Sequence, residues 1–232
     1  MKKISKKELK NILEKHKKWL MNEKDGKRAN LSYTDLSNAD LNYAELQYAD
    51  LNHTNLAKAN LYHANLQFAE LRFANLTNAE LSNADLDCIG LCFANLYNAD
   101  LSYTNLSNAN LQFSELRFAN LTNAELSNAD LSGTNLSGAN LTNADLSGAN
   151  LEFANLTQAK LPKQIIRIGP IGSRKSYTII NLGDDIITCG CWKGSLEEFK
   201  IRIDEVYPDG KYRDQYLGVI SLVESLRSVE NA

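Results

Sequence analysis

The sequence contains no long run of apolar residues. No segment approaches the ~18 consecutive apolar residues of a membrane-spanning helix, so we expect no transmembrane segment and no membrane partner. Residues 1–20 are basic but lack an apolar core and a cleavage site, so we expect no signal peptide. Only four cysteines occur in 232 residues, which favours free thiols in a reducing compartment, and we expect a cytoplasmic location.

No large excess of one charge is present either. Lys and Arg number 25 against 28 Asp and Glu, a net charge of −3, so nothing indicates direct binding to nucleic acid. The charges are unevenly distributed along the chain. Residues 1–28 carry +7, residues 29–161 carry −10 and residues 162–232 carry zero, and we expect these segments to be three domains.

What the sequence has in abundance is leucine at every fifth position. From Leu31 to Leu161 there are 27 such leucines without a gap, and the residue two before is alanine in 21 of the 27 cases. Five steps of about 100° would spread the leucines around a helix, and an odd period does not fit a flat strand. In an extended triplet, however, alanine and leucine point to one side, while Asn or Asp between them points out. Each pentad is therefore predicted to be one edge and one corner of a coil.

Segments such as Ala39–Tyr43 (ADLNY) and Ala74–Asn78 (ANLTN) resemble the pentapeptide-repeat pattern A-[DN]-L-x-x, and the resemblance covers residues 29–161. It implies an all-β solenoid: a right-handed quadrilateral β-helix with four pentads per coil and a continuous buried leucine column. Some relatives, the quinolone-resistance pentapeptide proteins, resemble duplex DNA and bind type II topoisomerases. The resemblance therefore implies DNA mimicry as an alternative function. The many aromatic corners instead favour a structural or protein-binding role.

The second residue after each leucine lies at a corner. Of 26 such positions, 11 are Asn or Gly, which tolerate the positive φ of a type II turn. Ten are aromatic, and because aromatics resist positive φ we expect a different turn there. With twenty residues per coil, six rings share one column that only Gly133 interrupts: Tyr33, His53, Phe73, Phe93, Phe113 and Phe153. Such a column is either a self-stacking ladder or an exposed stripe for a partner or a second copy.

One pentad is irregular. Ile89 stands where alanine usually points inward, and Gly90 follows where Asn or Asp is usual. Since overfilling a packed core is unfavourable, we predict a local bulge or bend at Ile89. Cys88 and Cys92 flank Ile89 and Gly90, and local packing is a better interpretation of them than a site.

Both ends of the repeats carry other structure. The pattern Ser5-x-x-Glu8 and the helical spacing that follows predict an N-terminal helix that caps the open coil within residues 1–28. Residues 162–232 predict an α+β module, with strands near 164–168, 177–182 and 186–191 and helices over about 195–206 and 212–226. The last helix presents an apolar stripe that a small module can hardly bury alone: Tyr216, Val219, Ile220, Val223 and Leu226. We therefore predict a homo-oligomer, either a dimer or a dimer of dimers.

Candidate catalytic groups are few. His53 and His63 lie two pentads apart, hence on opposite sides of the coil, so they cannot share a metal. Cys189 and Cys191 alternate to one face of a strand and are predicted to be buried, although an enzyme site around Arg174 and these cysteines is an alternative. This region resembles a small module that recurs in bacterial and phage proteins. The resemblance does not point to any particular activity.

We accordingly expect no catalytic residue, no cofactor and no metal site. The sequence favours a non-catalytic structural or protein-binding scaffold, whose partners are a second copy and an unidentified protein. The candidate interaction surface consists of Phe73, Phe93, Phe113, Phe153, Tyr216, Val219, Ile220 and Val223.

Overall fold

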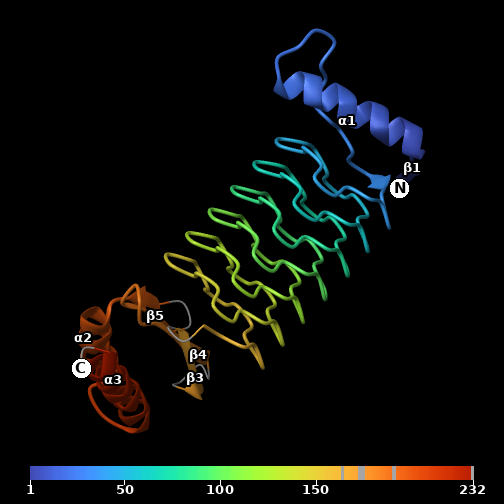
Figure 1. Ribbon diagram of the computed structural model, residues 1–232. Helices are drawn as coiled ribbons and strands as arrows, with labels where there is room; N and C mark the ends of the chain where they lie inside the picture. The colour runs from blue at the N-terminus through green and yellow to red at the C-terminus, as the bar shows by residue number, and fades with distance from the viewer. Residues whose placement is uncertain (163–164, 172–175, 190–191, 231–232) are drawn as a thin grey trace. The chain divides into compact units, whose positions relative to one another are not determined.

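A computed structural model describes residues 1–162, 165–171, 176–189 and 192–230 (Figure 1). The chain forms two compact units, which we call the repeat unit (Met1–Asn150 with Ala154–Lys160) and the C-terminal unit (Leu151–Phe153 with Leu161–Ala232). Within the described ranges, no helix has the length and apolar character needed to cross a membrane.

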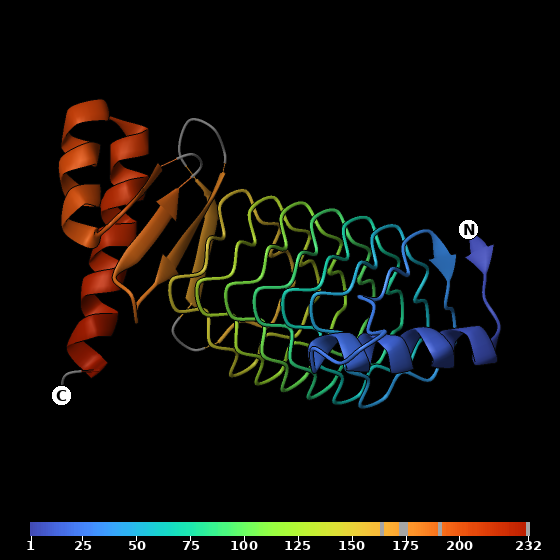
Figure 2. The same ribbon diagram turned by 90° about the horizontal axis from the view of Figure 1, so that it is seen from above.

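The repeat unit is a stack of coils that pair through their backbones (Figure 2). Parallel bridges join residues twenty positions apart, from Asn30 with Asp50 to Asn140 with Lys160, so each coil consists of four pentads. The leucines from Leu31 to Leu141 each donate their N–H to a carbonyl of the next coil, as Leu31 does to Asp50 at 2.7 Å. The leucines from Leu31 to Leu156 are all buried and form the core of the stack.

The Asn or Asp between alanine and leucine has two hydrogen-bonding roles, which Asn105 illustrates. Its Oδ1 accepts the main-chain N–H of Ser107 at 3.1 Å, and its Nδ2 donates to Oδ1 of Asp85 in the preceding coil at 3.1 Å. The first bond satisfies an N–H that the coil leaves unpaired, and the second ties neighbouring coils together. This explains the preference for Asn and Asp at that position of the pentad.

The prediction of a different turn at the aromatic corners was wrong. All 26 corner residues have a positive φ, between 53° and 69°, whether they are Asn, Gly or aromatic. Because φ is positive at the third turn residue and not at the second, every corner follows the type II pattern. The left-handed conformation costs about 1–2 kcal/mol at a non-glycine residue. Another turn would break the bond between coils, such as that from the Phe93 N–H to the Gln112 carbonyl at 3.0 Å, and the stack therefore overrides local preference.

The predicted bulge at Ile89 was wrong as well. Ile89 is buried in a regular coil, and Gly90 bridges to Glu70 and to Asn110 in the same register as every other pentad. A Cβ at position 90 would lie 2.7 Å from Oε2 of Glu70, so glycine leaves room for that longer carboxylate. The core thus accommodates isoleucine in place of alanine without a change of backbone.

The N-terminal segment packs on the first coil. Helix α1 (Lys6–Leu20) lies across the N-terminal end of the coils, and strand β1 (Lys2–Lys3) pairs in parallel with β2 (Thr34–Asp35) (Figure 1). Ser5 is the N-cap and its side chain accepts the N–H of Glu8 at 3.1 Å. The Glu8 carboxylate binds Lys2 rather than closing the capping box, so half of the predicted motif forms.

The C-terminal unit is a four-stranded antiparallel sheet in the order β3-β4-β5-β6 with two helices on one face (Figure 2). The strands are Ile165–Ile171, Ser176–Asn181, Ile186–Cys189 and Trp192–Gly194. Helix α2 covers Leu196–Val206 and α3 covers Lys211–Glu230. The capping box of Ser195 and Glu198 forms completely, as the sequence predicted.

The expectation of an exposed apolar stripe on α3 was wrong. The stripe lies in the core of the C-terminal unit, together with Ile180 and Ile187 of the sheet and Phe199 of α2. Alternate strand residues supply the apolar face that covers the helix, so the unit buries the stripe by itself. The residues concerned are Tyr216, Val219, Ile220 and Val223, while the side chain of Leu226 lies outside the described part of the structure.

Candidate interaction surface

One corner column carries five stacked rings, which we call the aromatic ladder. Successive ring centroids are 4.6, 4.9, 5.1 and 5.3 Å apart, and adjacent planes differ by 4–13°. Because each corner has the same left-handed backbone, each ring projects in the same direction and lies on the ring of the next coil. The ladder consists of Tyr33, His53, Phe73, Phe93 and Phe113.

The rings of the ladder stack on each other and still contact solvent. Phe93, in its interior, remains 46% exposed, and Tyr33 at its N-terminal end is 60% exposed. The column is therefore both self-stacked and exposed to solvent. The result is a continuous apolar strip along one side of the coils.

Glycine ends the ladder. A Cβ on Gly133 would lie 2.5 Å from Cδ1 of Phe113, so the Phe113 ring covers the position where a side chain would stand. Phe153, which follows the break in the sequence, has the same positive φ of 58° and is 68% exposed. It makes no ring contact with any residue that the structure describes, so it is not a member of the ladder.

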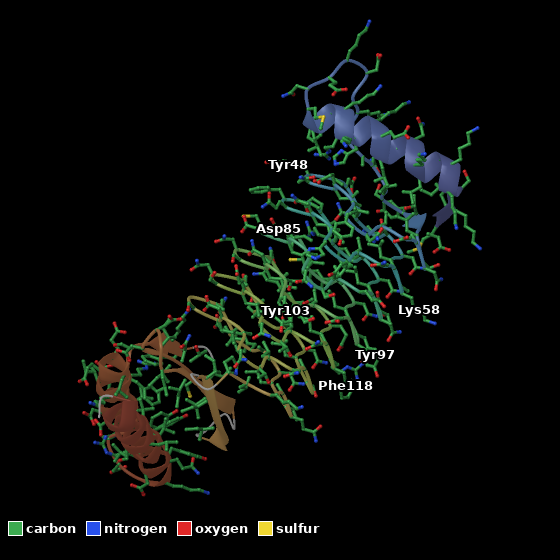
Figure 3. All side chains as sticks on the ribbon, viewed as in Figure 1. Tyr48, Lys58, Asp85, Tyr97, Tyr103 and Phe118 are labelled. Carbon is green, nitrogen blue, oxygen red and sulfur yellow. The ribbon has the colours of Figure 1, made fainter. Side chains whose placement is uncertain are left out.

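Two further stacks occur on the first coils, and sequence reasoning did not single them out. Tyr48 lies on Phe68 at 5.0 Å and meets Trp19 of α1 edge-on at 6.2 Å, close to the N-terminal end of the coils (Figure 3). Tyr43 lies on His63 at 5.2 Å. The sequence signal for both stacks is the spacing of twenty residues, which places Tyr48 beside Phe68 and Tyr43 beside His63 in the other corner columns.

The geometry of the aromatic ladder limits what it can contact. Stacking covers both faces of the three inner rings, His53, Phe73 and Phe93, so between its ends the ladder presents ring edges to solvent. An aromatic edge carries partial positive charge, and it attracts the face of another ring, a methionine sulfur or an aliphatic side chain. The surface can bind protein side chains, whereas a sugar or a nucleobase would require a free ring face.

The cysteines of the repeat unit are part of the packing. Sγ of Cys92 lies 2.9 Å from Oδ1 of Asn110, and the side chain is buried. Burial raises the pKa of both Cys88 and Cys92. Their thiols therefore stay protonated and weakly nucleophilic, which supports a packing role.

In the C-terminal unit, Cys189 lies in a small polar cluster. Its Sγ accepts the Thr178 hydroxyl at 3.3 Å and lies 3.7 Å from the Tyr216 hydroxyl, whose pKa burial raises. Neither neighbour is a base that would activate the thiol. Arg174 and Cys191, the other members of the alternative enzyme site, lie outside the described residues.

A metal site does not emerge from the described residues either, because no three His, Cys, Asp or Glu side chains there gather closely enough to hold an ion. His53 and His63 lie in separate stacks, each against aromatic neighbours.

The profile of a known family matches the repeats. Described as pentapeptide repeats, it matches eight copies within residues 27–57, 54–87, 93–128 and 124–161, which together cover more than half of the chain. The chain belongs to the pentapeptide repeat family. Membership implies a right-handed β-helix, in agreement with the stacked parallel coils.

Solved pentapeptide repeat proteins resemble the chain. HetL from the cyanobacterium Nostoc sp. strain PCC 7120, involved in heterocyst differentiation regulation, is 29% identical over 59% of this chain and 80% of its own, with a TM-score of 0.30. Alr5209 from Nostoc PCC 7120 is 39% identical over 38% and 74%, with a TM-score of 0.36. QnrB1, a plasmid-mediated fluoroquinolone resistance protein, is 22% identical over 59% and 78%, with a TM-score of 0.28. No curated protein matches the chain.

Proposed function

We propose that this pentapeptide repeat protein is a non-catalytic scaffold that binds another protein through the aromatic ladder. In this proposal the coils form a four-sided β-helix, closed at its N-terminal end by α1, that holds the ladder rigid. The observation that supports it is the run of five stacked rings, of which Phe93 is 46% and Phe113 58% exposed. A contiguous exposed apolar strip on a soluble protein is typical of a protein-binding surface.

The exposed ring edges favour a protein that offers ring faces, methionine or aliphatic side chains. Two ladders placed against each other would instead bring like-polarised edges together, which disfavours a second copy as the occupant. We also propose a cytoplasmic location, since the described cysteines Cys88, Cys92 and Cys189 are free thiols, as in a reducing compartment.

Quantitative affinity capture from a native lysate tests the scaffold function. The ladder variant combines Phe93→Ser with Phe113→Ser, and the matched control combines Tyr103→Ser with Phe118→Ser, two exposed aromatic corners outside the ladder. We expect a protein that the wild-type chain and the control retain and that the ladder variant loses. Capture of the same proteins by all three would contradict the proposal, provided that circular dichroism shows all three folded.

Light scattering at high protein concentration identifies the occupant. A dimer of the wild-type chain that becomes a monomer in the ladder variant would make a second copy the occupant and support the predicted homo-oligomer. A monomer in both cases assigns the ladder to a different protein. The predicted dimer of dimers required two contact surfaces, the aromatic column and the apolar stripe of α3. Because the α3 stripe is buried, only the aromatic column remains available.

The acidic side chains of the coils support a scaffold more than a DNA mimic. Asp85, Asp100 and Asp130 each accept an amide of the next coil through Oδ1, and each also accepts the main-chain N–H two residues later. Negative charge at these positions thus has a structural use. We expect the protein to leave supercoiling by gyrase unchanged; inhibition at stoichiometric protein would favour the mimic instead.

A further inference from the structure

The N-terminal face of the first coil has unpaired backbone along two of its edges. In the stack, Leu41 donates its N–H to the Asn60 carbonyl at 2.8 Å, and Asn60 donates its own N–H to the Ala39 carbonyl at 2.9 Å. By the same geometry the N–H and carbonyl of Asp40 point away from the second coil. Among the described residues, none forms a main-chain hydrogen bond with these two groups.

The next edge repeats this arrangement. Leu46 donates to Asn65 at 2.8 Å and Asn65 donates to Ala44 at 2.9 Å, which leaves the N–H and carbonyl of Glu45 facing the N-terminal side. Asp40 and Glu45 are exposed, so these groups are accessible to an incoming chain. Two consecutive edges therefore offer four hydrogen-bonding groups at the spacing that a preceding coil would use.

The adjacent edge shows that this end of the coil accepts a strand. There β1 pairs in parallel with β2, with Lys2 opposite Thr34 and Lys3 opposite Asp35, and the Lys2 N–H donates to the Tyr33 carbonyl at 2.9 Å. The chain's own N-terminus thus uses one edge of the first coil in the way that another peptide can use the next two.

A cavity of about 560 Å³ lies between α1 and these two edges. Leu9 and Leu13 line its helix side together with lysines, and Ala39 and Ala44 line its coil side together with Tyr43. Ala39 and Ala44 are only half-buried, whereas the inward alanines from Ala49 to Ala144 are buried. The helix therefore leaves apolar surface uncovered where the backbone is also unpaired.

We propose that this cavity binds a short peptide of a partner protein by parallel strand addition, with the peptide extended along each of the two edges and turned at the corner between them. Its backbone bonds to Asp40 and Glu45 as a preceding coil would, and its small apolar side chains at alternate positions lie between Leu9, Leu13 and the two alanines. On each edge the second of the two apolar residues is followed by Gln. The coils supply the precedent: Gln67 donates to the Asp85 carboxylate of the next coil at 2.7 Å, and Gln112 does the same to Asp130 at 2.6 Å.

The probe is a designed peptide, acetyl-ANLQNANLQ-amide, carrying a fluorescent label and titrated with the full chain while anisotropy is recorded. The matched control peptide has N-methyl-leucine at both leucines, which removes the two N–H groups that would bond to the Asp40 and Glu45 carbonyls. We expect saturable binding of the probe and a loss of at least about tenfold in affinity for the control peptide, because two interstrand hydrogen bonds are missing.

Protein variants locate the site. Asp40→Asn should weaken the probe severalfold, because the carboxylate that accepts Gln is lost, while Asp100→Asn, at the same column position inside the stack, should leave affinity unchanged. The ladder variant should bind the probe like the wild type. Peptide binding in the cavity is thus tested separately from protein binding at the aromatic ladder. No saturable binding at millimolar peptide, or equal binding of the N-methylated peptide, would overturn it.

Discussion

Nδ1 of the buried His16 accepts the main-chain N–H of Ala29 at 3.1 Å, and this bond joins α1 to the first residue of the coils. His16 also stacks on Trp19 at 5.6 Å. Burial lowers the pKa of His16 below its usual value near 6.5, and the nearby Arg28 lowers it further, while the Gln47 backbone and Glu45 act in the opposite direction. If the His16 ring were protonated, its Nδ1–H would face the main-chain N–H of Ala29, and the hydrogen bond would be lost because both groups are donors.

We therefore predict that stability falls on acidification because of His16. With a lowered folded-state pKa, the unfolded chain binds more protons than the folded chain below about pH 6.5. The contribution of His16 is therefore complete above pH 6.5 and is lost progressively as pH falls from that value through the lowered folded-state pKa. Denaturant unfolding between pH 5 and about 8 measures this. His16→Asn keeps an acceptor for Ala29 and should flatten this part of the profile. An unchanged slope in His16→Asn would exclude the assignment.

The double hydrogen bonding of Asn105 predicts a clear loss on truncation. Asn105→Ala leaves the Ser107 N–H without its acceptor and removes the amide that binds Asp85, and we expect a loss of about 1–3 kcal/mol in the free energy of unfolding. Asn42→Ala, at the exposed position directly after Leu41, is the control and should change stability by less than about 0.5 kcal/mol. Equal effects of the two changes would show that the edge amides contribute nothing beyond a surface asparagine.

Ile89 should now be a stabilising residue. Because the coil around it is regular, Ile89→Ala leaves a cavity and we expect a loss of about 2–4 kcal/mol, with about 0.5–1.5 kcal/mol for Ile89→Val. Chemical denaturation of both variants measures the difference. A neutral or stabilising effect of Ile89→Ala would mean that the isoleucine is strained in its site.

The aromatic corners predict a difference between stacked and isolated rings. Tyr103 has no ring contact among the described residues, so Tyr103→Asn relieves the left-handed backbone and should stabilise the protein by up to about 1 kcal/mol. Phe93→Asn brings the same relief but removes two stacking contacts worth about 0.5–1.5 kcal/mol each, so it should destabilise the protein. If both changes have the same sign, stacking does not stabilise the ladder.

The period of five predicted one edge and one corner for each pentad, because an extended triplet directs Ala and Leu inward and the residue between them, such as Asn105, outward. The ring stack was predictable only with the resemblance to pentapeptide repeats, which implies twenty residues per coil and so superimposes Phe73, Phe93 and Phe113. The turn at these residues was not, because the local preference of an aromatic for negative φ is weaker than the hydrogen bonds that the corner makes with the next coil.

The errors at Val223 and Ile89 share one physical origin. Whether the α3 stripe is buried depends on which faces Ile180 and Ile187 present, and that is a property of the assembled sheet rather than of the helix sequence. Whether Ile89 fits depends on space inside the coil, which a pattern of residue types does not measure. The cavity beside Ala39 was likewise not predictable, because its size depends on how α1 lies on the first coil.

The pairing of residues twenty positions apart restricts how relatives of this protein can vary in length. Gain or loss of one pentad leaves every inward leucine in place, so the fold tolerates it, but it rotates all later corners by a quarter turn. A pentad inserted after Phe73 would thus place Phe93 and Phe113 on a neighbouring side and divide the ladder. Selection for folding alone permits insertions or deletions of five residues. Selection for a continuous surface along one side permits only insertions or deletions of twenty residues.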